Sequence, residues 1–236
     1  MNTRSLPVVA AYACLYLVWG TTYLAIAFAI ETLPPFTSGG IRFAVAAALM
    51  GLWLVLRAPE QLRGLPWKHA LLSGALLGGM GNGFVVWAQQ GVPSGVAALI
   101  VSSIPVNVLL LDWLFFSRKA PSRRSLAGIG LGLAGVITIV LERHGIDGAA
   151  PSIYLAAILC ATLAWSTGTL LQKRGTPPHR LLGVTFVQML SAAALQLGLG
   201  FATGELAGFD PSTVSAASLI AVAYLAIFGS IIALNC

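Results

Sequence analysis

Residues 7–30 read PVVAAYACLYLVWGTTYLAIAFAI, a stretch without one charged side chain. A helix needs about 20 mostly apolar residues to cross the hydrocarbon core of a bilayer, and this stretch is long enough. It is too long for the apolar core of a cleavable signal peptide, and more apolar stretches follow at once. We therefore expect residues 7–30 to form an uncleaved first membrane span.

The composition of the whole chain agrees with a membrane protein. Of 236 residues, 58% are hydrophobic and only 8% are charged, whereas soluble domains carry about 25% charged residues. A soluble fold could not cover its surface with so few charges. The formal net charge of +6 does not indicate nucleic-acid binding, because the bases lie in short clusters between apolar stretches and form no basic face.

Seven further apolar stretches follow the first one. The eight predicted spans are 7–30, 37–56, 70–88, 95–116, 126–141, 152–172, 181–202 and 213–235. The fifth is the shortest, and we expect it to extend toward Ser122. The predicted fold class is therefore all-α, a polytopic membrane helix bundle with eight transmembrane helices.

The basic residues test this number of spans, because Lys and Arg in short loops stay on the cytoplasmic side. With strict alternation, one side receives Arg4, Arg57, Arg63, Lys68, Arg118, Lys119, Arg123, Arg124, Lys173, Arg174 and Arg180. Only Arg143 falls on the other side, and Arg42 lies within a span. We expect a multi-pass inner-membrane protein with a cytoplasmic N-terminus.

A short motif occurs twice. Residues 19–24 read WGTTYL and residues 165–170 read WSTGTL. A Pro-Pro pair and a Phe follow each copy, and the spacing from the Pro-Pro pair to the Phe is the same in both. These positions are Pro34, Pro35 and Phe43 in the first copy and Pro177, Pro178 and Phe186 in the second. A repeat with an odd number of helices must be inverted, and transporters often bind substrate between inverted halves. The alternative is chance recurrence in a Trp-rich chain.

Several segments, taken in order, resemble the EamA-type transporters of the drug/metabolite transporter superfamily. They are WGTTY at 19–23, LPPF at 33–36, IRF at 41–43, SIPV at 103–106, LAG at 126–128, GLAGV at 132–136 and LAIFGS at 225–230. The resemblance implies two inverted repeats of five helices each, ten in total, and usually the export of small metabolites.

The chain departs from that family pattern in two places. Residues 1–145 would hold the first five-helix repeat, and residues 146–236 only three helices of the second. The last two helices would then be missing, so we expect a truncated or fragmentary sequence. In addition, residues 112–116 read DWLFF where the family often has an apolar stretch ending in Gly-Glu.

Polar and aromatic side chains from four spans should lie at a similar depth, about ten residues into each span. They are Trp19, Asn82, Asn107 and Trp165, and Thr22 joins the candidate substrate site through its motif. The Trp side chains lie too deep for aromatic belts, so they line a pocket or pack in the bundle. The amides should face inward, toward a zwitterionic or polar solute or toward a neighbouring helix.

Arg42 is the one base predicted inside a span. It lies about five residues from the outer end, so we expect it to reach toward the outer surface, with Glu31 as candidate partner. Binding of a substrate carboxylate is the alternative role of Arg42.

Two further polar residues are candidates. Gln188 should reach either the cavity or a neighbouring helix. Asp112, which lies close to residues 118 and 119, is a weaker candidate for proton coupling.

Small residues and a proline predict local packing. The pairs Gly74/Gly78 and Gly128/Gly132 should allow close helix approach, and Pro105 should kink the fourth span. Enzyme chemistry has little support, because the sequence shows no Ser–His pair, no metal-ligand spacing and no phosphate-binding loop. We expect no catalytic residue, no metal and no cofactor.

The sequence therefore predicts a secondary transporter that exports or exchanges a small organic metabolite by alternating access. Its substrate would be an amino acid, amine, nucleobase or drug-like solute, held in a cavity between spans one, three, four, six and seven. The expected partners are this solute and the lipid bilayer, with a homodimer left open. The alternatives are a flippase for lipids or lipid-linked sugars, and a non-transporting membrane subunit.

Overall fold

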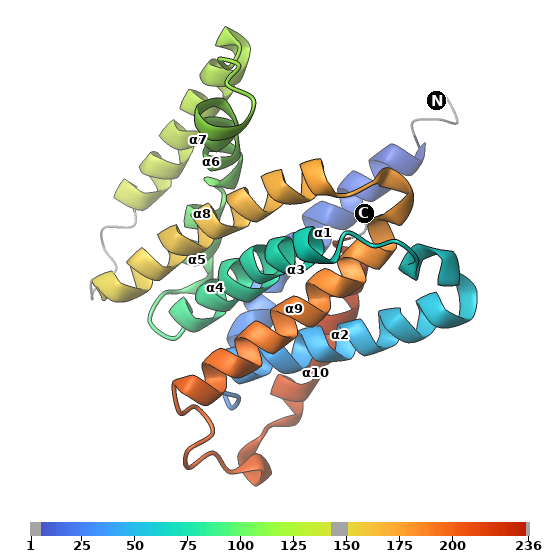
Figure 1. Ribbon diagram of the computed structural model, residues 1–236. Helices are drawn as coiled ribbons and strands as arrows, with labels where there is room; N and C mark the ends of the chain where they lie inside the picture. The colour runs from blue at the N-terminus through green and yellow to red at the C-terminus, as the bar shows by residue number, and fades with distance from the viewer. Residues whose placement is uncertain (1–5, 143–150, 235–236) are drawn as a thin grey trace.

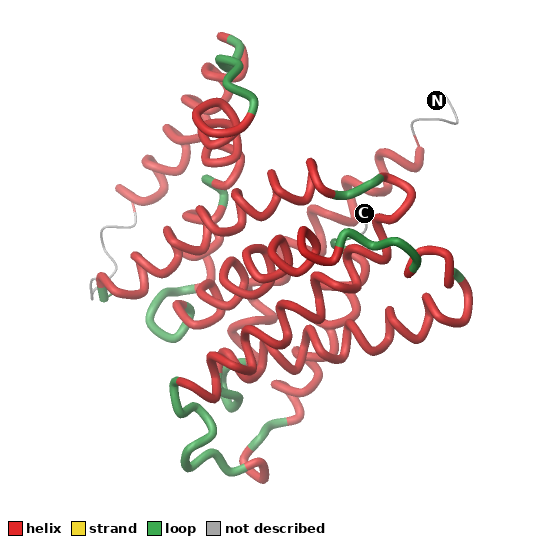
Figure 2. Tube along the Cα trace, viewed as in Figure 1, coloured by secondary structure: helices red, strands yellow, loops and turns green. Residues whose placement is uncertain are grey.

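The computed structural model describes residues 6–142 and 151–234, and helices are the only regular structure in these ranges (Figures 1 and 2). The elements are α1 (Leu6–Ala29), α2 (Pro35–Arg57), η1 (Pro59–Leu62), α3 (Trp67–Gly74), η2 (Ala75–Asn82), α4 (Gly83–Ala88), α5 (Ser94–Val101), α6 (Ile104–Leu111), η3 (Asp112–Phe116), α7 (Arg123–Glu142), α8 (Ser152–Gly175), η4 (Pro178–Arg180), α9 (Leu181–Ala202), η5 (Pro211–Thr213), α10 (Ala216–Tyr224) and η6 (Leu225–Ile232).

In the part of the chain that the structure describes, these elements form the helical rods that the sequence predicts, numbered here in chain order. The first and second rods are α1 and α2, the third is α3–η2–α4, the fourth is α5–α6–η3, the fifth, sixth and seventh are α7, α8 and α9, and the eighth is α10–η6. Within the described residues, the helices long and apolar enough to cross a membrane are Pro35–Arg57, Trp67–Ala88, Ser94–Phe116, Ser152–Gly175 and Pro178–Ala202. Tyr16–Ala29 and Ala216–Ile232 are shorter apolar helices. The fifth predicted span corresponds to α7, which begins at Arg123 as the expected extension requires. The prediction of an all-α, polytopic membrane bundle is confirmed.

Some sequence predictions fall on residues that the structure does not describe. These are Arg4, Arg143 and the proposed boundary between residues 145 and 146. The predicted interruption near Pro105 is present, because α5 ends at Val101 and a new helix begins at Ile104.

Three of the described rods change from an α-helix to a π-helix partway along, and the shortest of these π-helical segments is η3. In η2 and in η6 the backbone is π-helical over eight residues each, and each segment directly follows a short α-helix. A π-helical turn is wider than an α-helical turn and often lies at a functional site. The sequence analysis did not predict either segment. Both contribute to the cavity described below.

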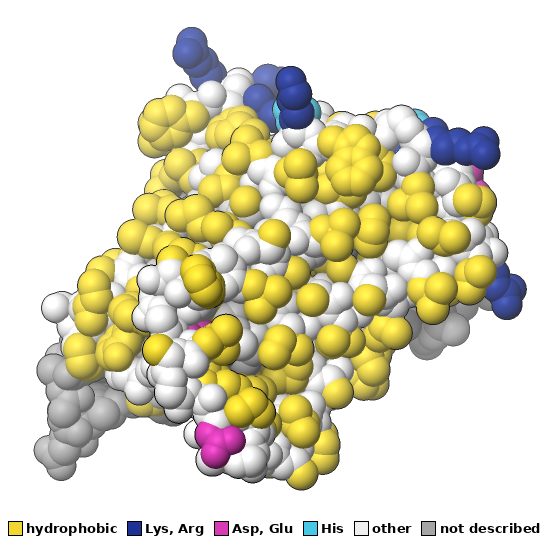
Figure 3. Space-filling model, turned by 60° about the horizontal axis from the view of Figure 1, so that its bottom comes forward, with side chains coloured by type: hydrophobic (Ala, Val, Ile, Leu, Met, Phe, Trp, Pro, Cys, Tyr) yellow, Lys and Arg dark blue, Asp and Glu magenta, His cyan; other side chains and the backbone are white. Residues whose placement is uncertain are grey.

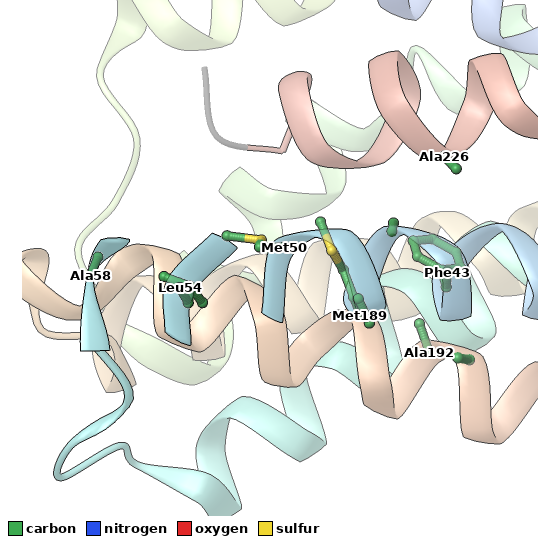
Figure 4. Packing of buried hydrophobic residues seen from close by; sticks show 10 residues of the cluster. Phe43, Met50, Leu54, Ala58, Met189, Ala192 and Ala226 are labelled. Atoms are coloured by element: carbon green, nitrogen blue, oxygen red, sulfur yellow. The ribbon is translucent and has the colours of Figure 1, made fainter. Parts of the chain in front are cut away.

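At the centre of the bundle α2 packs along α9, and the two helices lie side by side in Figure 1. Around this pair, α1 packs on α10, and α8 packs on η2. Figure 4 shows Phe43 and Met50 of α2 meeting Met189 of α9, with Ala226 of η6 beside them. This cluster is buried and holds three rods together.

Glycines set how closely these rods approach. A Cβ at Gly74 would lie 2.5 Å from the backbone Cα of Gln188, and one at Gly78 would lie 2.5 Å from the Cβ of Ala192. The predicted close approach at this pair is confirmed. Gly128 on α7 differs, because no described atom lies within 4 Å of the Cβ that it would carry. The same holds for its partner Gly132, so α7 makes no close contact through the second pair.

Three basic links gather at one end of the bundle. Arg180 donates a hydrogen bond to the carbonyl of Glu60, which joins the link after α2 to the link after α8. Arg174, in the last turn of α8, lies 3.6 Å from the carboxylate of Asp112, which joins the end of α8 to the end of the fourth rod. Asp112 is therefore paired with Arg174, whereas the sequence placed it beside residues 118 and 119. This pair is exposed, so its contribution to stability is small.

Figure 3 shows the resulting distribution of charge on one face. Lys and Arg side chains follow the upper and right-hand edges, hydrophobic side chains cover most of the area between, and an acidic side chain stands at the lower end. This is the distribution that alternating spans with basic links on one side would produce.

At the opposite end, Glu205 caps the start of α2. Its carboxylate accepts hydrogen bonds from the backbone N–H groups of Phe36 and Thr37 at 2.9 and 2.8 Å, and from the Thr37 hydroxyl at 2.9 Å. The first N–H groups of a helix have no partner within the helix, and an anion there also meets the positive end of the helix dipole. Glu205 thus ties the loop after α9 to the central helix pair.

We expect Gly74→Ala to lower the free energy of unfolding by about 1–3 kcal/mol, because the new methyl group would collide with the backbone of α9. Gly128→Ala is the matched control, since it adds the same group where no described atom lies within 4 Å. Thermal unfolding of both purified variants in detergent measures the difference. Equal loss of stability in the two variants would contradict the packing described.

We expect Glu205→Ala to destabilise the protein by about 0.5–2 kcal/mol through loss of the α2 cap, and Glu205→Gln to cost less because it keeps one acceptor oxygen. Glu31→Ala is the control, because Glu31 is exposed and makes no hydrogen bond within the described residues. The same unfolding measurement applies. If Glu31→Ala costs as much as Glu205→Ala, the cap contributes nothing specific.

Candidate functional site

A cavity of about 220 Å³ lies near the middle of the bundle. A cavity of this size suits a small solute. Its wall comes from α1, α2, η2, α4, α5, α6, α8, α9 and η6, and from the residues just after η6. The second and eighth rods therefore contribute in addition to the five spans that the sequence analysis named. Most of the lining residues are apolar, with a few polar groups among them.

Six of the seven candidate residues line this cavity. They are Trp19, Thr22, Arg42, Asn82, Trp165 and Gln188. The seventh, Asn107, is not part of the wall. Its amide nitrogen donates to the hydroxyl of Thr162 at 3.0 Å, which joins α6 to α8. Thr162 does line the cavity, so Asn107 is connected to the cavity wall only through its hydrogen bond to Thr162.

The two Trp residues of the repeated motif meet each other. Their ring centroids are 5.9 Å apart and the ring planes are inclined at 80°, an edge-to-face contact between α1 and α8. Trp165 also lies against η2 at Gly81, where a Cβ would come within 3.0 Å of its ring. Trp19 is 41% exposed and lines the cavity. Edge-to-face pairs are a favoured arrangement of aromatic rings.

Arg42 points into the bundle, and the expectation that it would reach the outer surface is wrong. Its side chain is only 3% exposed. Nε donates to the Ser230 hydroxyl at 2.9 Å, and Nη2 donates to the Gly229 carbonyl at 3.0 Å. Nη1 makes a long hydrogen bond of 3.4 Å to Oδ1 of Asn82. Glu31 is exposed and makes no ion pair with Arg42.

The backbone of η6 explains this inward orientation. Gly229 has no side chain, and a Cβ there would lie 3.1 Å from Nη2 of Arg42. The guanidinium can therefore reach a backbone carbonyl and a hydroxyl of the eighth rod. It also lies over the ring of Phe43, with its carbon 4.9 Å from the ring centroid. These polar and aromatic partners replace the solvent that a surface position would have supplied.

Gln188 has both of the roles that the sequence left open. It lines the cavity, and its Nε2 donates to the hydroxyl of Ser73 at 2.8 Å. A second buried amide, Gln196, was missed by the sequence analysis. Its Nε2 donates to the carbonyl of Gly78 at 2.6 Å, which ties α9 to the π-helical segment η2.

Other wall residues were also missed, among them Tyr23, Thr162 and Gly229. Tyr23 belongs to the repeated motif, so the motif itself was a usable signal. The roles of Gly229 and its neighbour Ser230 depend on the π-helical backbone of η6, for which the sequence carries no simple pattern. These positions could be found only from the structure.

The two ends of the cavity differ in character. Toward the end where α1 stops, a buried apolar cluster that includes Ile26, Val86 and Leu225 packs across α1, α4, α10 and η6. In the other direction the wall continues to Gln172, in the last turn of α8, and to Leu234. The cavity therefore extends toward the end of the bundle that carries the basic links.

Comparison with known proteins agrees with this architecture. A family model described as the EamA-like transporter family matches residues 7–141. The uncharacterized inner membrane transporter YedA of Escherichia coli K12 is 35% identical over 231 residues, which are 98% of this chain and 72% of YedA. Protein PecM of Dickeya dadantii is 28% identical over 218 residues, which are 92% of this chain and 69% of PecM.

A solved crystal structure is also similar in fold. It superposes with a TM-score of 0.66 at 25% sequence identity, over 98% of this chain and 77% of its own. The similarity thus extends beyond residues 7–141 to the later rods, including α8, α9 and η6. The apolar helices and the named relatives support a multi-pass protein of the inner membrane. From the matched family and from a relative of this identity and coverage, the chain belongs to the EamA-like transporter family.

Proposed function

We propose that the cavity is the substrate site of a secondary transporter that exports or exchanges a small organic metabolite by alternating access. The observation that supports it best is the convergence of Trp19, Arg42, Asn82 and Trp165, from four separate rods, on one cavity near the middle of the bundle. A mostly apolar wall with a few placed polar groups is typical of small-molecule sites.

Alternating access requires two parts that move against each other. We assign these parts to residues 1–145 and 146–236, as inverted repeats. Corresponding rods pair in corresponding ways, since α1 packs on α10, α8 packs on η2, and α2 packs on α9. The π-helical segments η2 and η6 also follow short α-helices in the corresponding third and eighth rods. Transporters with inverted repeats commonly bind substrate between the halves.

A flippase would need a groove open to lipid, and the exposure of the polar wall residues argues against one. Arg42 is 3% exposed, and Asn82 and Gln188 are each 7% exposed. Lipid tails offer no hydrogen bonds to such groups, whereas a small polar solute does. The cavity therefore favours a solute that enters from water.

We further propose that the N-terminus and the basic links face the cytoplasm. The hydrogen bond from Arg180 to Glu60 and the ion pair between Arg174 and Asp112 keep these links at one end. Basic links on the cytoplasmic side are the rule for inner-membrane proteins. With this orientation, the cavity extends toward the cytoplasm.

We expect Trp19→Ala and Trp165→Ala each to weaken solute binding by about 3- to 10-fold, because each removes an aromatic wall contact. Membrane insertion should not change. Efflux from proteoliposomes, assayed with labelled amino acids, amines and nucleobases, gives the apparent affinity.

Trp53→Ala is the control for the two Trp variants, since Trp53 lies on α2 outside the cavity and is 50% exposed. Unchanged affinity in both cavity variants would remove the Trp pair from the site. No flux of any solute would favour a non-transporting subunit.

Reporter tags test the orientation. We expect tags at the N-terminus, at residues 118–124 and at residues 173–180 to be cytoplasmic, and a tag at residues 89–93 to be external. Cysteine labelling from either side of intact cells gives the same information with smaller insertions. A tag at residues 118–124 and one at residues 173–180 on opposite sides would exclude the assignment of inverted halves.

A further inference from the structure

We propose that the transported solute is a small organic monoanion, whose carboxylate binds Arg42 and whose apolar body lies against Trp19 and Trp165. This inference rests on the proposed function and names the substrate class of the same cavity. It is carried by a positive charge in the wall for which the described part of the protein supplies no negative partner.

The charge inventory of the site is the first step. Arg42 stays protonated in proteins, so it brings one full positive charge into the bundle. None of the residues that line the cavity is acidic. The one ion pair among the described residues joins Arg174 to Asp112 at the end of the bundle. Arg42 is therefore held by neutral groups only.

Hydrogen-bond geometry is the second step. A guanidinium has five N–H donors in one plane. Three of them have acceptors here, on Ser230, Gly229 and Asn82, and the contact with Asn82 is long at 3.4 Å. Two N–H groups thus lack an acceptor within the described residues. A carboxylate can accept two parallel hydrogen bonds from a guanidinium, so it matches both the unused donors and the unbalanced charge.

The neutral partners also fix the position of the cation. Contacts to η6, to η2 and to the Phe43 ring hold the guanidinium at the cavity wall. A site whose donors are already oriented loses less conformational freedom when it binds an anion. The arrangement therefore provides a preformed receptor for one carboxylate.

The rest of the wall selects the body of the solute. Trp19 and Trp165 supply an aromatic surface, and Leu77, Ile104 and Met189 add apolar area. No lining residue is acidic, so a solute ammonium group would find no carboxylate to pair with and would be repelled by Arg42. A volume of about 220 Å³ limits the solute to a small molecule. An aromatic or branched aliphatic monocarboxylate meets these conditions.

The test compares three solutes that share one ring and chain length: 3-phenylpropionate, 3-phenylpropionamide and 3-phenylpropylamine. We expect the purified protein to bind the carboxylate about 10- to 100-fold more tightly than the neutral amide, because charged hydrogen bonds are stronger than neutral ones. The amine should bind least. Calorimetric titration in detergent measures the three affinities, and proteoliposome efflux shows which of the three solutes is moved.

Variants then assign the preference to one side chain. We expect Arg42→Gln to lower the affinity for the carboxylate to that for the amide, and Arg42→Lys to retain part of the preference as a single point charge. Arg57→Gln is the matched control, because it removes an exposed base from the end of the same helix. Arg57→Gln should leave the preference unchanged. The preference measured on the unaltered protein stands as a test even if Arg42→Gln fails to fold.

The outcomes separate the substrate class from the proposed function. Tight binding and efflux of the amine or the amide, without preference for the carboxylate, would overturn the monoanion proposal and leave transport intact. A folded Arg42→Gln protein that keeps the carboxylate preference would overturn it as well. Binding of none of the three solutes would also overturn it. The proposed function falls only if the reconstituted protein moves neither these solutes nor any of the broader panel.

Discussion

A guanidinium that cannot lose its charge imposes strict demands on an apolar bundle. Arg42 sits on the central helix α2 and its side chain is only 3% exposed, so neighbouring rods supply its polar acceptors. Those acceptors are a carbonyl and a hydroxyl of η6 and an amide oxygen of η2. Through these hydrogen bonds the Arg42 side chain connects α2 to η2 and to η6. The cavity lies where the three elements meet.

Packing around this centre depends on small residues, since lipid is as apolar as the helices and gives them no hydrophobic reason to associate. Gly74 and Gly78 bring the third rod against α9 at backbone distance. Gly81 lets Trp165 approach η2 closely, and Gly229 makes room for Arg42. At the glycines the rods touch closely. Beside them, the larger side chains of the wall surround the cavity. The α7 glycines show the contrast, because no described atom lies near Gly128 or Gly132.

Much of this fold was accessible from the sequence, because length and hydropathy alone specify membrane helices. The predicted seventh span has the same first and last residues as α9. The predicted third span ends at Ala88, where α4 ends, and the predicted fourth span ends at Phe116, where η3 ends. Depth along each span brought Trp19, Asn82 and Trp165 to one level, and they line one cavity. Depth does not give the direction in which a side chain points. Arg42 was therefore predicted to face the surface, and Asn107 to join the wall. The π-helical segments carry no sequence pattern, so the partners of Arg42 could not be found.

The contacts of the site also bear on how two halves could move. If residues 1–145 and 146–236 rock against each other, the hydrogen bonds from Arg42 to Gly229 and Ser230 would be strained or broken, because they join one half to the other. The hydrogen bond to Asn82 lies within the first half and can persist. The Trp19–Trp165 contact crosses the same boundary. The groups proposed to hold the solute are thus the groups that such a motion separates. A solute can shift the balance between two conformations only through contacts that differ between them. In this cavity the contacts of Arg42 and of the two Trp rings would differ most between the two conformations. Solute recognition and conformational change would then depend on the same few side chains.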